Sequence, residues 1–323
     1  MHPALSVILF TTLSGAGYGL WWLLGIHLWN GHFPDSDTLK LGALGLGFAL
    51  VSAGLLSSTV HLGHPERAWR ALSQWRSSWL SREGVAALVA YLPMLALTWL
   101  LWHGTGPAAV GATGLALSAL ALVTVYCTAR IYTSLRTVPA WHNAWVLPGF
   151  LLLGLYTGGM ALWALQALAG YPLTTIPLAA LMLMGLAAAV LKLGYWRFID
   201  RQALPVDSAS ALGLSGRGRV HRFEAPHTES AFLMKEMGFR VARRHAQRLR
   251  MLALVLAAIL PAIAIFAGYH APRAQAWLAP PAATAALLGV LLERWLFFAQ
   301  ARHLVVLYYA PVPAPSPANA TES

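Results

Sequence analysis

Residues 41–70 read LGALGLGFALVSAGLLSSTVHLGHPERAWR, and this stretch decides the class of the fold. Its first twenty residues are apolar or small and include no charged side chain. A helix of that length can cross the hydrocarbon core of a bilayer, which is about 30 Å thick. The run then ends abruptly in two histidines, a proline and two arginines. This pattern indicates a transmembrane helix that ends at a membrane–water interface, where titratable groups can meet a lipid-soluble substrate.

The composition extends this interpretation to the whole sequence. Of the 323 residues, 58% are hydrophobic and only 10% are charged, whereas soluble domains are roughly a quarter charged. The apolar runs are continuous, which argues against a β-barrel with its alternating segments. We therefore predict an all-α, polytopic membrane bundle of eight transmembrane helices with a short interfacial helix. The spans are expected at residues 5–29, 39–62, 83–103, 108–129, 144–168, 174–196, 251–269 and 282–309.

The loops between these spans carry very unequal charge. Most of the 22 Lys and Arg residues lie in the loops 63–82, 130–143 and 197–250, on the side that also holds both termini. The opposite side has only Lys40 and Arg273. Cytoplasmic loops of membrane proteins are enriched in Lys and Arg. We therefore expect the basic face and both termini on the cytoplasmic side of a bacterial inner membrane.

Two segments are expected outside the membrane. The basic loop 197–250 ends in a predicted helix that runs into the seventh span. This helix is expected to lie on anionic lipid heads, to dock a soluble subunit, or to do both. The Pro/Ala-rich tail, residues 311–323, is expected to be disordered. The membrane domain is accordingly assigned to residues 1–310.

The single cysteine, Cys127, limits the redox groups that this protein could hold. An iron–sulfur cluster is usually bound by four thiolates, and structural zinc by clusters of Cys and His. Neither is expected here, nor is any other metal site. Haem with two axial histidines is not favoured, because no histidine lies at the middle of a span with an obvious partner. Electron transfer would therefore depend on other subunits or on a diffusible quinone.

Two polar residues at the basic face are candidates for quinone chemistry. His61 ends the second span and Glu83 begins the third, so both lie at the same membrane face. Reducing a quinone takes up two protons with two electrons, and oxidising a quinol releases both. A His that hydrogen-bonds the ring oxygen and a Glu that passes a proton to water suit that reaction. The alternative is that the two residues simply cap their helices.

An amphipathic helix is expected between these two residues, starting at Pro65. Its apolar side chains recur every three or four residues and would face lipid, while its arginines would face phosphate or water. The apolar set is Trp69, Leu72, Trp75 and Trp79, and the arginines are Arg67, Arg70 and Arg76.

Glu293 and Arg294, expected near the middle of the eighth span, form a second candidate site. Charged residues inside a membrane are functional suspects. In a transporter or proton pump the two would lie on an ion path. The alternative is a structural salt bridge in which Arg294 is paired with another helix.

Three segments, residues 1–20, 58–84 and 232–250, resemble the membrane anchor of the dimethyl sulfoxide reductase type. The His-Leu-Gly-x-Pro-x-Arg-Ala pattern that starts at His61 is a fairly specific match, and the likeness covers nearly the whole sequence. The resemblance implies an eight-helix anchor without haem that exchanges electrons with the quinone pool. It also implies two partners, a four-cluster iron–sulfur subunit and a molybdopterin catalytic subunit.

The resemblance assigns the quinone-site histidine to His61 and the site glutamate to Glu83, which weakens the capping alternative. Arg67 and Trp69 are expected to border the quinone. The docking surface for the partner subunits is expected at six arginines: Arg67, Arg70, Arg76, Arg240, Arg243 and Arg244.

The expected topology suggests the direction of electron flow. The quinone site must lie on the face that docks the cluster subunit, and that face is the basic, cytoplasmic one. This arrangement resembles the sulfite-oxidising members of the family, so the predicted function is quinone reduction coupled to sulfite oxidation. The quinone is either ubiquinone or menaquinone. Three alternatives stay open: a menaquinol-oxidising anchor of a dimethyl sulfoxide or other respiratory reductase, a passive anchor that binds no quinone, and a proton-translocating membrane protein.

Overall fold

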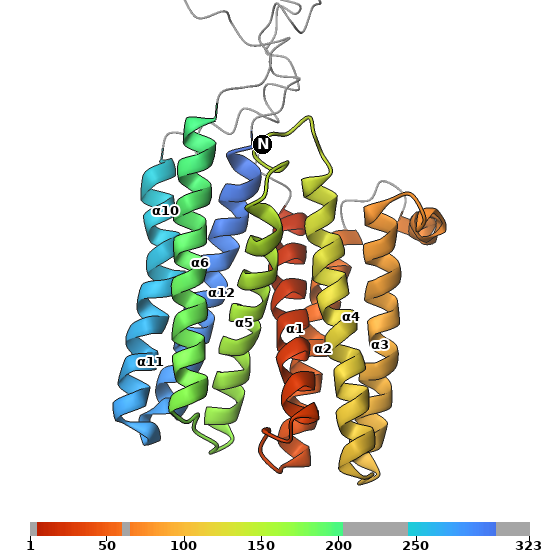
Figure 1. The fold of residues 1–323 in the computed structure, drawn as a ribbon, viewed down its shortest axis with the longest axis vertical. Helices are drawn as coiled ribbons and strands as arrows, with labels where there is room; N and C mark the ends of the chain where they lie inside the picture. The colour runs from red at the N-terminus through yellow and green to blue at the C-terminus, as the bar shows by residue number, and fades with distance from the viewer. Residues whose placement is uncertain (1–4, 60–64, 203–244, 302–323) are drawn as a thin grey trace, which may run out of the picture.

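The structure, a computed structural model, describes residues 5–59, 65–202 and 245–301 of the protein. All regular elements in these ranges are helices, and eight helical stretches are long and apolar enough to cross a membrane (Figure 1). The predicted all-α bundle is therefore confirmed. The spans are α1 (Leu5–Trp29), α2 (Asp37–Thr59), α3 (Trp79–Trp102), α4 (Pro107–Thr133), α5 (Val146–Leu168), α6 (Thr175–Arg201), a composite seventh span, and α12 (Gln275–Ala299).

Helix α1 lies at the centre of the bundle and packs against α2, α4, α5 and α12 (Figure 1). Close packing depends on glycines that let backbones touch. A Cβ atom added at Gly19 would lie 1.9 Å from the Gly154 carbonyl oxygen of α5, and one at Gly25 would lie 2.0 Å from the Gly114 carbonyl oxygen of α4. Only glycine fits at these two contacts.

The seventh span is formed by α10 (Ala246–Leu254), a π-helical turn η2 (Val255–Ile259) and α11 (Leu260–His270). The turn has a local cause. Pro261 has no backbone N–H, so it cannot bond the Ala257 carbonyl four residues earlier. The Tyr156 hydroxyl of α5 donates to that carbonyl instead, at 2.8 Å. The irregular turn is thus held by a side chain of a neighbouring helix, as a membrane interior requires.

The third span begins earlier than predicted, at Trp79 instead of Glu83. Ser78 is the N-cap, and its hydroxyl accepts a hydrogen bond from the Ser81 amide at 3.4 Å. Glu83 therefore lies at the start of the second turn and faces the bundle interior. The interpretation of Glu83 as a helix cap is wrong.

The eighth span also differs from its predicted range of 282–309. It begins at Gln275, after the short 3₁₀ turn η3 (Pro272–Ala274), and α12 ends at Ala299. The predicted span left out Pro280 and Pro281, yet both lie inside α12. Membrane helices tolerate such prolines. Glu293 and Arg294 consequently lie in the last two turns of α12 and not near the middle of the span.

The predicted interfacial helix is present as η1 (Pro65–Gln74), beside α3 at one end of the bundle (Figure 1). It begins at Pro65 as predicted, but it is a 3₁₀ helix and ends at Gln74, whose carbonyl accepts from the amides of Ser77 and Ser78 as the backbone turns into α3. Trp75 and Trp79 therefore lie outside it, and the expected apolar stripe does not run along one helix.

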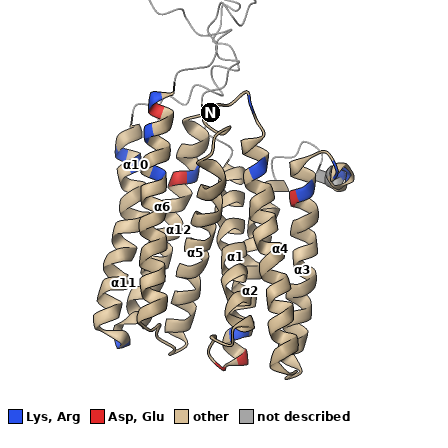
Figure 2. Ribbon diagram, viewed as in Figure 1, with Lys and Arg blue, Asp and Glu red and all other residues tan. Residues whose placement is uncertain are grey.

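Charge is unevenly distributed in the folded protein. Lys and Arg gather at the end of the bundle where α3 begins and α4 and α6 end (Figure 2). At the opposite end, Lys40 is paired with Asp35 and Asp37 at 3.2 and 2.9 Å. We call the first end the basic end.

The close approach of α1 and α5 generates a stability prediction. Gly19→Ala would drive a methyl group into the Gly154 carbonyl, so we expect a loss of about 1–3 kcal/mol in the free energy of unfolding. Thermal unfolding of the purified protein in detergent measures it. The matched control is Gly45→Ala, since a Cβ there meets nothing within 4 Å. An unchanged midpoint in Gly19→Ala would contradict the described contact.

Candidate functional site

Glu83 is a buried carboxylate near the basic end, with only 4% of its surface exposed. The Thr128 hydroxyl of α4 makes a short hydrogen bond to Glu83 Oε1 and also lies 3.1 Å from the Thr124 carbonyl oxygen. A hydroxyl has one hydrogen and can donate to only one of these acceptors. When Glu83 is ionised, Thr128 can donate to it. When Glu83 carries a proton, it can donate to Thr128, whose own hydrogen then turns to Thr124. The pair suits a group that gains and loses protons.

The connection between η1 and α3 is fixed beside this carboxylate. The Arg82 side chain donates from Nε to the Trp75 carbonyl at 3.0 Å and from Nη2 to the Arg76 carbonyl at 2.6 Å. The Trp79 ring receives two guanidinium groups, Arg82 at 4.3 Å and Arg130 at 5.0 Å from its centroid. Such cation–π contacts hold the first turn of α3 against α4.

The other residues of the predicted quinone site divide into two groups. Arg67, Trp69, Arg70 and Arg76 are exposed, and 66% of the Trp69 surface is accessible. Four further residues, His61, Arg240, Arg243 and Arg244, lie outside the described residues. The pairing of His61 with Glu83 thus stays a prediction. The structure places Glu83 inside the bundle, while Trp69 and Arg70 of η1 lie on its surface.

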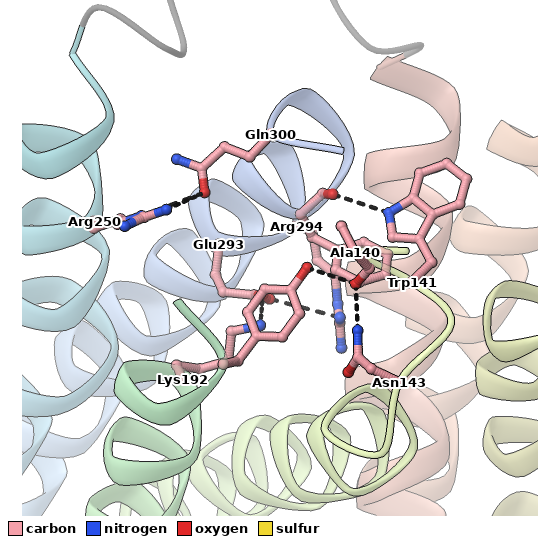
Figure 3. A network of polar contacts seen from close by, with 10 residues as sticks. Ala140, Trp141, Asn143, Lys192, Arg250, Glu293, Arg294 and Gln300 are labelled. Carbon is pink, nitrogen blue, oxygen red and sulfur yellow. Dashed lines mark hydrogen bonds and ion pairs between the residues drawn. The ribbon is translucent and has the colours of Figure 1, made fainter. Parts of the chain in front are cut away.

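A second set of charges lies buried between α6 and α12 (Figure 3). Lys192 of α6 forms a close ion pair with Glu293, and Arg294 Nη1 lies 3.6 Å from Glu293 Oε2. Arg294 also lies over the Phe150 ring at 3.7 Å, and Lys192 over the Tyr195 ring at 4.2 Å. All three charged residues are buried. We call Lys192, Glu293 and Arg294 the ion cluster.

The ion cluster corrects the sequence-based interpretation of this pair. A salt bridge to another helix exists, but Glu293 makes it, with Lys192 as the partner. The sequence shows Lys192 as a charged residue inside a predicted span. No sequence pattern, however, indicates which residues of α12 it faces. The cluster holds two cations and one carboxylate, so one positive charge is in excess.

The ends of α6, α10 and α12 are tied together above the ion cluster. Arg250 makes a bidentate pair with Asp200, at 2.6 and 2.9 Å, and its Nη2 lies 3.0 Å from Gln300 Oε1 (Figure 3 shows the Gln300 contact). Nearby, the Trp141 ring N–H donates to the Phe297 carbonyl at 3.1 Å. These contacts fix the basic end of the three helices.

Metal ligands do not gather in the part of the protein that the structure describes. No group of three or more His, Cys, Asp or Glu there could hold a metal ion, and Cys127 is buried.

Eight helices long and apolar enough to cross a membrane define a polytopic membrane protein. The chain belongs to the DMSO reductase anchor subunit (DmsC) family, which matches residues 1–299. It is 33% identical to the C component of the sulfite dehydrogenase from Allochromatium vinosum, over 97% of this protein and 100% of that one.

Two relatives from Escherichia coli match a shorter part of the sequence. The YnfH component of an anaerobic dimethyl sulfoxide reductase is 31% identical over 56% of this protein and 64% of its own length. The C component of the anaerobic dimethyl sulfoxide reductase is 28% identical over 51% of this protein and 58% of its own length. No solved structure matches the sequence.

The charge count of the ion cluster generates a prediction. Glu293→Gln leaves two buried cations without a carboxylate, so we expect a loss of about 3–5 kcal/mol in the free energy of unfolding. Lys192→Met leaves Glu293 beside Arg294 as a neutral pair and should cost less. Thermal unfolding of the two variants, side by side, measures the difference. A Lys192→Met protein that is less stable than Glu293→Gln would contradict this assignment of charges.

Proposed function

We propose that this protein is the quinone-reactive membrane subunit of a molybdopterin oxidoreductase complex, and that it passes electrons between an iron–sulfur subunit and the quinone pool. The observation that carries the proposal is the buried Glu83 carboxylate with its Thr128 partner at the basic end, beside an exposed interfacial helix. A buried carboxylate in a membrane helix is costly and calls for a function. Membership of the anchor family supports the same conclusion.

In the proposed site, the His61 side chain hydrogen-bonds a ring oxygen of the quinone and Glu83 exchanges a proton with it. Arg67 and Trp69 border the ring. Reduction of the quinone to the quinol takes two electrons, which the iron–sulfur subunit supplies, and two protons, which come from the cytoplasmic water through Glu83 and His61. A positioned carboxyl group is a suitable acid and base for such a transfer.

The partner subunits are proposed to dock at the basic end. They comprise a four-cluster iron–sulfur subunit and a molybdopterin catalytic subunit, which hold the metal groups of the complex. Electrons must reach the quinone from the nearest cluster, so the docking face and the quinone site share one end of the bundle. The docking arginines are Arg67, Arg70, Arg76, Arg240, Arg243 and Arg244.

Quinone reduction coupled to sulfite oxidation is the direction that we propose. Two observations support it. The excess of Lys and Arg at the basic end indicates a cytoplasmic location for this face and both termini. The relative that spans nearly the whole sequence belongs to a sulfite dehydrogenase, whereas the dimethyl sulfoxide reductase relatives match about half of it.

A menaquinol-oxidising anchor of a respiratory reductase is the second candidate, and the likeness to the dimethyl sulfoxide reductase relatives favours it. Proton translocation through Glu293 has less support, because Glu293 is already paired with Lys192 and Arg294.

The site assignment is tested on the complex purified through a tag on this subunit. We expect Glu83→Gln and His61→Ala to lower sulfite-dependent quinone reduction by roughly 10²-fold or more, as loss of a general acid or base does. Reduction of an artificial dye by sulfite should survive, because it bypasses this subunit. Spectrophotometric rates with a short-chain quinone provide the measurement.

Asp35→Asn, at the opposite end of the bundle and exposed, is the matched carboxylate control. Unchanged quinone rates in both site variants, together with no binding of a quinol analogue, would mean that the subunit is a passive anchor. Quinol-dependent sulfoxide reduction without sulfite oxidation would reverse the proposed direction.

The orientation has its own test. Arg136 and Arg273 are exposed at opposite ends of the bundle, and the native Cys127 is buried. We expect a membrane-impermeant maleimide to label Arg273→Cys in intact spheroplasts, and to label Arg136→Cys only after lysis. The reverse pattern would place the basic end outside the cytoplasm.

A further inference from the structure

A small cavity lies inside the bundle between α1, α4, α5 and α12. Its internal volume is about 10 Å³, close to what a single water molecule needs. Thr12 and Tyr18 of α1, Thr128 of α4 and Arg294 of α12 line it. The cavity therefore touches both the hydrogen-bond partner of Glu83 and the ion cluster.

Three polar atoms of this lining are buried without a protein partner. They are Thr12 Oγ1, the Tyr18 hydroxyl and Arg294 Nε, and no hydrogen bond reaches them from the residues that the structure describes. The Thr124 hydroxyl lies near Tyr18. Its hydrogen goes to the Leu120 carbonyl at 2.8 Å, so it cannot also donate to the phenol, which has no partner at hydrogen-bond distance among the described residues. All three residues are at least nine-tenths buried. Unpaired polar atoms in such surroundings cost free energy.

Other hydroxyls on the same cavity are satisfied within their own helices. Thr11 donates to the Val7 carbonyl at 3.0 Å, and Thr157 donates to the Leu153 carbonyl at 2.8 Å. The three unpartnered atoms thus differ from their neighbours, and they converge from two helices. A water needs two to four polar partners, and this cavity provides them.

We propose that the cavity is a water site, and that its water links the excess positive charge of the ion cluster to Glu83. Arg294 Nε–H donates to the water oxygen, the water donates to Thr128 Oγ1, and Thr128 donates to the ionised Glu83. Every hydrogen bond in this series points from the cation toward the carboxylate, so each polarises and strengthens the next. Thr12 and Tyr18 hold the water in place.

Arg294 is thereby a positioning residue for the proton step, and this role rests on the proposed quinone function. The ion cluster has one cation too many, and Glu83 supplies the missing negative charge. Within the described residues, the titratable groups that interact with Glu83 are Tyr18 of α1 and Cys127 and Tyr132 of α4, with Arg82 one residue before it on α3.

The water site is tested by stability, without any activity. Thr12→Val and Tyr18→Phe each remove one unpartnered hydroxyl. In a dry cavity the removal should leave the melting temperature unchanged or raise it, because an unsatisfied polar atom is lost. With a bound water we expect a lower melting temperature. Thr11→Val and Thr157→Val, whose hydroxyls bond their own helices, are the matched controls.

The link to Glu83 is tested by the pH dependence of quinone-coupled turnover in the purified complex. Arg294→Met leaves the Lys192–Glu293 pair neutral, so it should fold. Glu83 must carry a proton in order to deliver it to the quinone, so turnover falls as the pH rises through its titration. Without the cation the ionised form of Glu83 is less favoured, and we expect the alkaline limb of the pH–rate profile to move up by about one unit. Arg294→Lys should restore part of the shift. Dye-linked activity should not change.

The outcomes separate this inference from the proposed function. If Glu83→Gln abolishes quinone turnover while Thr12→Val, Tyr18→Phe and Arg294→Met leave melting and pH profile unchanged, the water site is wrong and the function stands. If Glu83→Gln has no effect on turnover, the proposed quinone site fails, and the melting temperatures alone decide whether the water is present.

Discussion

At Gly19, helix α1 approaches α5 so closely that a methyl group would meet the Gly154 carbonyl oxygen. In a bilayer, helices gain little from hydrophobic association, since lipid tails are as apolar as leucine. Helix association depends instead on van der Waals contact and interhelical hydrogen bonds. Small residues let α1 approach α4 in the same way at Gly25 and Gly114. These contacts set the spacing of the central helices. Side chains from α1, α4, α5 and α12 can line one small cavity only because the helices approach to this distance.

The buried carboxylates of the interior each have a described polar partner. Glu83 has a hydroxyl that can donate or accept, and Glu293 lies between two cations. Phe150 and Tyr195 present ring faces to Arg294 and Lys192, which lowers the cost of burying those cations. The charges are concentrated toward the basic end, where the distance to water is short, and the middle of the bundle is held by aromatic and aliphatic packing.

Much of this architecture could be predicted from the sequence, because a run of twenty apolar residues is a strong and local signal. Glu83 could be predicted for a similar reason, as a carboxylate at the edge of a span. The partner Thr128 could not, since the register of α4 against α3 is a property of packing and leaves no spacing pattern. The start of α12 was misplaced because Pro280 and Pro281 resemble a loop in sequence, although a membrane helix accommodates them. Lys192 was visible as a buried charge, but its pairing with Glu293 depends on the fold.

The Arg250–Asp200 pair has a consequence for the basic loop between α6 and α10. Its bidentate geometry, with Gln300 as a further acceptor, holds the two ends of the loop together and joins both to α12. The contacts of Arg250 thus offset part of the entropic cost of bringing the loop ends together, and they do so within this protein itself. The same two helices that Arg250 joins, α6 and α12, carry Lys192 and Glu293, so the contacts of Arg250 also help to fix the spacing of the ion cluster.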